Sequence, residues 1–133
     1  MKINIGDVFV NTFSVSESVY DGFINTFKDK NPLHTNDAYA QKKGFAERVM
    51  HGNILGGFLS FFIGECLPSK DVVIHSQDIK YLKPVYLDDV LQLHVVVNTI
   101  HDSVNAVEFK YYFKRTSNDE IVAKGKIQIG LFK

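Results

Sequence analysis

The 133-residue sequence predicts an α+β fold in which an antiparallel sheet wraps around one long buried helix. Three observations predict this arrangement. The run from Ile54 to Leu67 is almost entirely apolar. Four β-rich segments follow it from residue 72 onward, and the last three are separated only by short, turn-like segments. An antiparallel sheet with one solvent-exposed face needs another element to pack on its opposite face, and the Ile54–Leu67 run is the only segment apolar enough to do so.

Composition limits the kinds of partner we expect. Hydrophobic residues make up 45% and charged residues 23%, which is typical of a globular chain, and the length fits one domain, residues 1–133. The 15 basic and 15 acidic residues cancel, which argues against nucleic acid and against an anionic membrane as partners. Cys66 has no partner for an internal disulfide, and the N-terminus lacks a signal-peptide pattern, so we expect a cytoplasmic protein.

The first strand is expected at Asp7–Phe13, which mixes β-branched, aromatic and polar residues. A helix should follow, because Ser14 and Glu17 have the spacing of a capping box with Ser14 as the N-cap. An apolar residue then recurs at every fourth position and gives this helix its buried stripe: Val19, Phe23 and Phe27.

Pro32 disfavours helix in the residue before it, so the first helix is expected to end near Asp29 and the chain to run extended through the next residues. A second, short helix should begin at Thr35 or Asn36, both of which are competent N-caps. Gly44 is expected to end it in the left-handed conformation.

The Ile54–Leu67 run is apolar around its whole circumference, which predicts a helix enclosed on most sides. It is shorter than the ~18 residues of a membrane span and contains Glu65. Each glycine in such a helix costs about 1 kcal/mol relative to alanine. We expect close approach of the sheet to explain the glycines here: Gly52, Gly56, Gly57 and Gly64.

The second half of the chain predicts an antiparallel meander. The candidate strands are Val72–Leu82, Val90–Ile100, Val104–Arg115 and Ile121–Leu131. Apolar residues alternate with charged or polar ones in the third strand, which predicts a sheet with one wet face.

Chemistry is expected in the loop from Asp29 to His34. A carboxylate and an imidazole five positions apart, on a loop bent by Pro32, suit general acid–base work on a bound water. Asn31 lies between them and is expected to orient the loop. Gly52 precedes the buried helix, so its unpaired N–H could serve a carbonyl oxygen as an oxyanion hole.

Plainer interpretations of the same residues remain open. Asp29 and His34 are also compatible with a turn stabilised by aspartate and followed by an ordinary histidine. His51 is either a third site group or a support for the helix start. Asp29, His34 and His51 are suitable zinc ligands, but no cysteine accompanies them and we predict no metal.

A resemblance carries this further. The run DKNPLH at residues 29–34, together with Tyr39-Ala40, Phe45, Arg48 and His51-Gly52, resembles the MaoC-like, (R)-specific enoyl-CoA hydratase family. The later Lys80–Val85 and Asp88-Asp89 are also similar, so the resemblance covers nearly the whole chain. It implies a single hot-dog domain.

The resemblance implies hydration of a trans-2-enoyl thioester of CoA or acyl carrier protein to the (R)-3-hydroxyacyl thioester, or the reverse, without a cofactor. Asp29 and His34 match the catalytic pair, Gly52 the oxyanion donor and Asn31 the supporting amide. Ser60 lies where a second active-site hydroxyl is often found. Family members usually join two sheets edge to edge, which implies a homodimer or a higher homo-oligomer.

One departure from the family falls just before the loop. Many members carry a small residue followed by Gly or Glu ahead of the catalytic aspartate, whereas this chain has Phe27-Lys28. We therefore expect a difference in substrate scope more than in chemistry. Two other functions stay open on the same fold: an acyl-thioester hydrolase and a non-catalytic module that binds acyl groups.

Overall fold

The structure is a computed structural model that describes residues 1–132. Its helices are α1 (Glu17–Phe27), α2 (Pro32–Thr35), α3 (Asp37–Lys42) and α4 (Asn53–Phe61), and α4 continues as a π-helical segment, Phe62–Cys66. Its strands are β1 (Val8–Ser14), β2 (Val72–Gln77), β3 (Lys80–Tyr81), β4 (Val90–His101), β5 (Ala106–Arg115) and β6 (Ile121–Leu131). A 3-10 turn, Asp102–Val104, joins β4 to β5.

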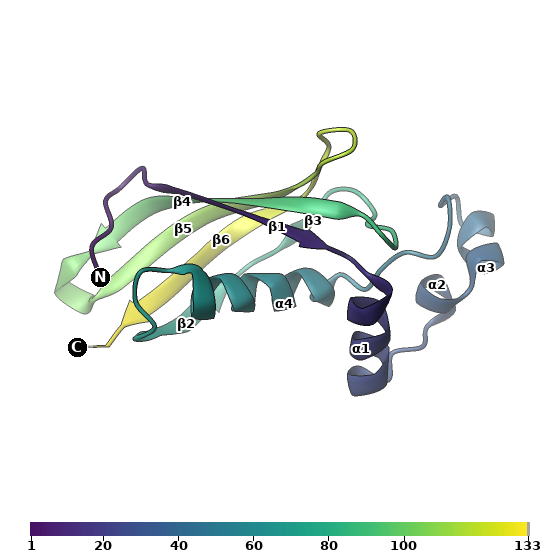
Figure 1. Ribbon diagram of the computed structural model, residues 1–133, viewed down its shortest axis with the longest axis horizontal. Coiled ribbons are helices and arrows are strands. Elements are labelled where there is room, and N and C mark those ends of the chain that lie inside the picture. Colours follow the sequence, from purple (N-terminus) through teal and green to yellow (C-terminus); the bar gives the residue numbers. More distant parts are fainter. Residues whose placement is uncertain (133) are drawn as a thin grey trace.

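The strands form one antiparallel sheet in the order β1-β4-β5-β6-β2, with β3 also paired to β6. This sheet curves over α4, which lies against its inner face (Figure 1). The residues of β5 that face α4 are buried and those between them are partly or fully exposed, as the alternation predicts. The predicted α+β fold, with its antiparallel sheet around a long central helix, is confirmed.

The largest buried side chains come from α4 and from the inner face of the sheet. Each is less than 2% exposed, and those without β-branching are Phe62, Phe109, Phe113, Leu55, Leu59, Leu91 and Leu93. Burial of a side chain of this size contributes roughly 1.5–3 kcal/mol to folding. The helix is therefore held firmly against the sheet.

The segment expected as one strand, Val72–Leu82, is two strands separated by Asp78 and Ile79. Asp78 donates its N–H to the Lys126 carbonyl oxygen (3.0 Å), and its Oδ1 accepts the Lys126 N–H (3.1 Å). A side-chain oxygen thus takes the place of a backbone acceptor, and the regular ladder is interrupted. The prediction of a single strand was wrong for this reason.

Two expectations about α4 need correction. Its face away from the sheet is exposed, with Phe61 51% accessible and Ser60 and Gly64 also at the surface, so the helix is not enclosed there. A Cβ added at Gly57 or Gly64 would meet no atom within 4 Å, so close approach does not explain these glycines. At Gly52, by contrast, a Cβ would lie 2.8 Å from the Tyr81 ring of β3.

Capping was predicted correctly for one helix and not for another. Ser14 is the last residue of β1 and pairs with Val90, so Ser16 caps α1 instead, its Oγ accepting the Val19 N–H (3.2 Å). Asn36 caps α3 as predicted, since its Oδ1 accepts the Tyr39 N–H (2.9 Å).

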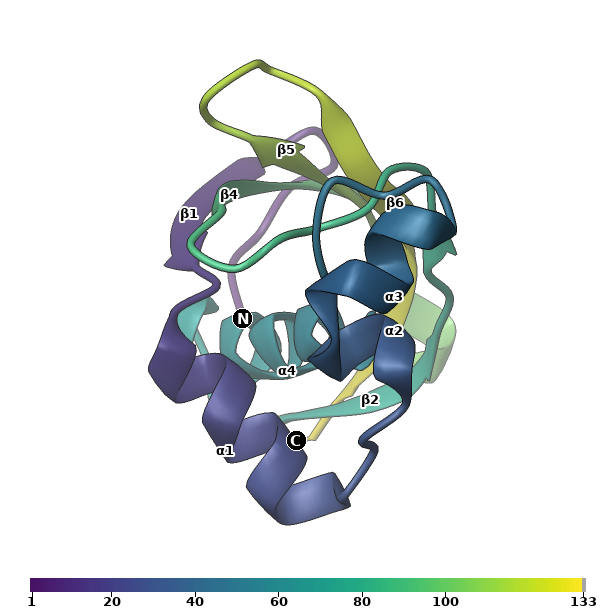
Figure 2. The same cartoon turned by 90° about the vertical axis from the view of Figure 1, so that its right-hand side faces the viewer.

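The other three helices, α1, α2 and α3, gather at the end of the molecule where α4 begins (Figure 1). In Figure 1 they lie at the right-hand end, and Figure 2 looks onto that end, with α1 on one side and α2 and α3 on the other. The loop from Asp29 to His34 joins α1 to α2 there. Within residues 1–132 no helix is both long and apolar enough to cross a membrane.

Candidate active site

The loop with the predicted chemistry starts from a reversal at Lys28. This residue is left-handed (φ 65°, ψ 15°), and its N–H donates to the Ile24 carbonyl oxygen (2.8 Å) to end α1. Asn31 then organises the turn: its Oδ1 accepts the Leu33 N–H (2.9 Å), and its own N–H donates to Asp29 Oδ1 (3.1 Å). Asn31, predicted to orient the loop through its amide, is therefore also the N-cap of α2.

His34 is fixed in one tautomer by the backbone. Its Nδ1 lies 2.7 Å from the Val49 carbonyl oxygen, and because a carbonyl only accepts, Nδ1 carries the proton in the neutral ring. Nε2 therefore presents a lone pair, 3.8 Å from Asp29 Oδ2. This distance is too long for a direct hydrogen bond, so both atoms are free to bind one water or substrate group.

His51 contacts both Asp29 and His34 and helps to hold them in place. It is 4% exposed, its Nε2 donates to the Asp29 carbonyl oxygen (2.8 Å), and its ring stacks on that of His34 with centroids 4.1 Å apart. Tyr20 adds a further contact by donating its hydroxyl to the His34 carbonyl oxygen. His51 also accepts the Ile54 N–H at the start of α4, so it joins the loop to the helix.

Gly52 lies at the entrance to α4 and opens onto a cavity of about 390 Å³. The first backbone bonds of the helix run from Ile54 to His51 and from Leu55 to Gly52, so they do not use the Gly52 N–H. His34 lines the same cavity, whose other walls are mostly apolar and include Phe45, Met50, Tyr81, Leu82 and Pro84.

Asp29 borders a second hollow, of about 760 Å³, between α1 and α4. Its lining is also largely apolar and includes Val19, Phe23, Phe27, Gly57 and Phe58. Ile54 lines both hollows. The carboxylate of Asp29, half exposed, and the imidazole of His34, 18% exposed, therefore meet where the two hollows approach each other.

Ser60 is not brought to this site. It follows Asn53 by seven residues on α4, a rise of about 10 Å, and lies on the exposed face of the helix. Within the described chain it lines neither hollow. Of the six predicted site residues, the structure groups five: Asp29, Asn31, His34, His51 and Gly52.

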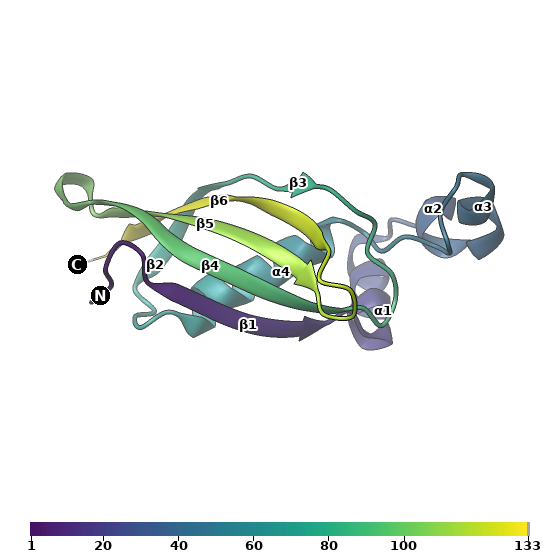
Figure 3. The same cartoon turned by 90° about the horizontal axis from the view of Figure 1, so that it is seen from above.

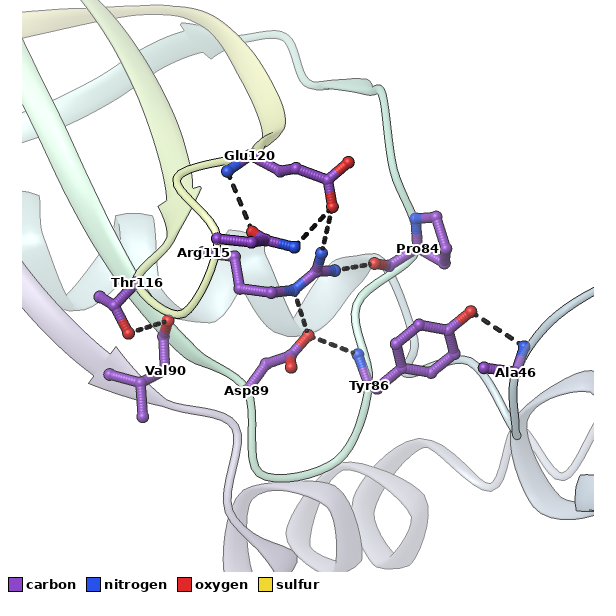
Figure 4. A network of polar contacts seen from close by, with 9 residues as sticks. Ala46, Pro84, Tyr86, Asp89, Val90, Arg115, Thr116 and Glu120 are labelled. Atoms are coloured by element: carbon purple, nitrogen blue, oxygen red, sulfur yellow. Dashed lines mark hydrogen bonds and ion pairs between the residues drawn. The ribbon is translucent and has the colours of Figure 1, made fainter.

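A buried arginine holds one wall of the first cavity (Figure 4). Arg115 of β5 is 8% exposed, and its guanidinium donates to three acceptors on neighbouring segments: Asp89 Oδ2 (3.0 Å), Glu120 Oε1 (2.9 Å) and the Pro84 carbonyl oxygen. Tyr86 extends this network, because its N–H donates to Asp89 and its hydroxyl accepts the Ala46 N–H (3.2 Å). The sheet thus positions the segment that carries Pro84 and Val85.

Comparison with known proteins identifies the family and the fold. Residues 9–118 match the family model described as MaoC like domain. The chain belongs to the MaoC-like domain family. The hot-dog fold that the resemblance implied is likewise confirmed by similar solved structures, including the R-hydratase PhaJ1 of Pseudomonas aeruginosa (TM-score 0.86, 26% identity, covering 97% of this chain and 82% of that one).

Two curated relatives of this MaoC-like domain carry names that bear on function. An (R)-specific enoyl-CoA hydratase of Rhodospirillum rubrum is 32% identical over 97 residues, which are 73% of this chain and 67% of that protein. A 3-hydroxybutyryl-CoA dehydratase of Methylorubrum extorquens is 28% identical over 97 residues, or 73% of this chain and 60% of that protein. The alignments thus span about three fifths to two thirds of these relatives.

Asp29, His34 and His51 also form the one group in residues 1–132 whose ligand atoms lie within 4.8 Å of one another. Two of their four ring nitrogens already face carbonyl oxygens, His34 Nδ1 and His51 Nε2. Of the remaining atoms, His34 Nε2 and Asp29 Oδ2 lie 3.8 Å apart, whereas the Nδ1 of His51 is buried and has no hydrogen-bond partner among the described residues. In this MaoC-like domain, two of the ring nitrogens that could bind a metal are therefore already engaged.

Three contributors to the site were missed by reading the sequence. They are the Val49 carbonyl that sets the His34 tautomer, the Tyr20 hydroxyl and the Tyr81 ring against Gly52. Burial raises the pKa of Tyr81, so its hydroxyl stays protonated at neutral pH. None of the three stands in a local pattern that marks it, because each acts across a long separation in sequence.

Proposed function

We propose that this MaoC-like domain is a hydro-lyase that adds water to a trans-2-enoyl thioester of CoA or acyl carrier protein, or removes it from the (R)-3-hydroxyacyl thioester. The observation that carries the proposal is the open Nε2 of His34, 3.8 Å from the Asp29 carboxylate and in one cavity with Gly52. The names of the hydratase and dehydratase relatives support it.

The geometry suits each part of this reaction. The Gly52 N–H would receive the thioester carbonyl oxygen and stabilise the negative charge that develops on it as water oxygen bonds to C3. Asp29 and His34 would take a proton from that water and return a proton to C2. One water is added in total, and the pair ends with the protons with which it began.

The apolar walls serve the same chemistry. Most of the first cavity is lined by aliphatic and aromatic side chains, which exclude water from the thioester and strengthen the Gly52 interaction. Either hollow is large enough for a short acyl chain. No cofactor enters the proposed reaction.

The test is an assay of crotonyl-CoA hydration, in which the reaction is measured by the loss of enoyl-thioester absorbance. Asp29→Asn and His34→Ala should each lower kcat at least about 100-fold, because each removes one half of the acid–base pair. Asp71→Asn and His101→Ala, which change exposed residues elsewhere, serve as controls and should retain activity. If either active-site variant hydrates crotonyl-CoA as fast as the wild type, the roles assigned to Asp29 and His34 are contradicted.

Product analysis separates the two alternative functions. Release of free thiol with the double bond intact would identify a thioester hydrolase. Saturable acyl-CoA binding without turnover of CoA-linked or carrier-linked substrates would identify a non-catalytic module. Formation of the 3-hydroxyacyl thioester supports the hydro-lyase.

We also propose that the domain works as a homodimer or higher homo-oligomer, with a cytoplasmic location. β1 and β2 stand at the two edges of the sheet, and a free strand edge favours pairing with another chain. Sedimentation equilibrium tests this, and a monomer at micromolar concentration would contradict it.

A further inference from the structure

Four lysines form a compact group on the outer face of the sheet. Lys110 of β5 lies opposite Lys126 of β6, and Lys124 of β6 lies opposite Lys80 of β3. All four are exposed. We call this group the lysine square. Figure 3 looks onto the outer face and shows β5, β6 and β3 side by side.

This arrangement is unfavourable for the folded protein by itself. Like charges directly opposite each other on neighbouring strands are destabilising. Two nearby carboxylates offset part of this charge: Glu108 pairs with the Lys126 ammonium at 3.9 Å, and Asp78 lines the same hollow, so four ammonium groups face two carboxylates. In residues 1–132 no ion pair joins Lys80, Lys110 or Lys124 to a carboxylate.

The lysine square surrounds a hollow of about 350 Å³. The four lysines line it together with Asp78, Tyr111 and Gly125. Ammonium groups bind phosphate oxygens through short, charge-assisted hydrogen bonds. A hollow with four such groups in a chain of zero net charge fits a ligand that carries several phosphate charges.

The square is also next to the candidate active site. Successive side chains of a strand point to opposite faces, and in β3 Lys80 belongs to the outer hollow whereas Tyr81 lines the inner cavity beside Gly52. β3 is two residues long and pairs only with β6. A flexible molecule with one end at Gly52 therefore has only this short strand to cross.

We propose that the lysine square binds the phosphate groups at the nucleotide end of a CoA thioester whose acyl end lies at Gly52. The inference rests on the proposed function for the position of the acyl end. The lysine square contributes affinity for CoA, and the hydration reaction takes place in the cavity at Gly52.

The first experiment compares two substrates in a double variant, Lys110→Gln/Lys124→Gln. Its KM for crotonyl-CoA should rise about tenfold or more at low ionic strength, with kcat unchanged. Its kcat/KM for crotonyl-pantetheine, which lacks the phosphates, should equal that of the wild type. Lys2→Gln/Lys70→Gln removes the same charge from exposed positions elsewhere and should leave both values unchanged.

An unchanged KM for crotonyl-CoA, or an equal loss with both substrates, would overturn the proposal. A crotonyl thioester of acyl carrier protein, assayed as a third substrate, gives one more such outcome: a loss confined to it would assign the square to a protein partner. Each of these outcomes leaves the chemistry of Asp29 and His34 as proposed.

A second readout needs no turnover. Adenosine 3′,5′-bisphosphate, titrated by calorimetry, should bind the wild-type protein and the Lys2/Lys70 control and should lose most of its affinity for the Lys110/Lys124 variant. Binding with this pattern supports the square even if crotonyl-CoA is not hydrated. Absence of binding, or equal binding to all three proteins, counts against it.

Discussion

The stacked imidazoles of His34, in α2, and His51, just before α4, have different tasks because their nitrogens face different partners. His34 gives its proton-bearing Nδ1 to the Val49 carbonyl and keeps Nε2 open, whereas His51 gives its Nε2–H to the Asp29 carbonyl. Within residues 1–132 the buried Nδ1 of His51 has no hydrogen-bond partner. His51 therefore acts as a positioning residue, through the loop that it holds.

This role predicts different results for two substitutions of His51. The amide of His51→Gln reaches about as far as Nε2 and should retain much of the activity, while His51→Leu removes the donor and should lower kcat about tenfold. KM should change less than kcat, since the acid–base geometry is affected and the cavity walls are not. Steady-state kinetics on both variants check this, and equal activity of the two would contradict it.

Residue 52 is a glycine because the Tyr81 ring fills the space that a side chain there would need. A Cβ there would meet the outer atoms of the ring at 2.8 Å, and these belong to a partly exposed side chain that can move. We expect Gly52→Ala to shift Tyr81 and to lower kcat/KM substantially, with a Tm within a few degrees of the wild type. The added variant Tyr81→Leu should restore part of the activity, and a failure to do so would show that the defect is not steric.

At the scale of elements, the junction between α1 and the loop explains the departure from the family pattern. Lys28 adopts φ 65°, a left-handed conformation that glycine adopts without strain. The family resemblance leads one to expect Gly or Glu at this place, and of these two only glycine adopts the left-handed conformation without strain. This chain tolerates lysine there because the capping bond to Ile24 is still made.

Replacement of Lys28 by glycine should therefore stabilise the domain. The expected gain in the free energy of unfolding is about 1 kcal/mol, since the strain of the left-handed side chain is removed. Urea unfolding of Lys28→Gly measures it. Lys30→Gly, two residues along, has no positive φ to relieve and should not stabilise the protein.

The same scale shows what the sequence can and cannot predict. β6 begins and ends where its pattern predicts, and β4 extends one residue beyond the predicted Ile100. Both strands could be predicted because the alternation of apolar and polar residues is visible in consecutive residues of one segment. The loop from Asp29 to His34 was likewise singled out from adjacent residues, but its spacing alone was equally compatible with an ordinary turn, and the family resemblance of the DKNPLH run gave Asp29, Asn31 and His34 their roles, which stay a prediction. The Val49 carbonyl and the Tyr81 ring were not singled out, since contacts between distant segments leave no local signal.

At the scale of the molecule, the outer face of the sheet gives stability a pH dependence. Burial and the neighbouring Lys114 lower the pKa of His94 from its ordinary value of 6.5, and its ring stacks on Tyr112. The unfolded chain therefore binds this proton more readily than the folded one. Stability should fall as pH drops below about 6.5 and level off below the folded-state pKa.

His94→Gln tests this dependence. The loss of Tm between pH 7.5 and pH 5, values chosen to bracket the ordinary histidine pKa of about 6.5, should be smaller in the variant than in the wild type. Differential scanning calorimetry at both pH values gives the comparison. Identical losses would mean that other groups carry the acid sensitivity. His101→Gln, at an exposed position, is the matched control.

One side chain divides the space around the reacting groups. Ile54 lines both the cavity at Gly52 and the hollow beside Asp29, so its four-carbon side chain is a common wall. Shortening it would enlarge both compartments at once and bring them toward a single chamber. The two volumes are therefore not independent traits, and a change that admits a bulkier acyl group on one side also alters the fit on the other.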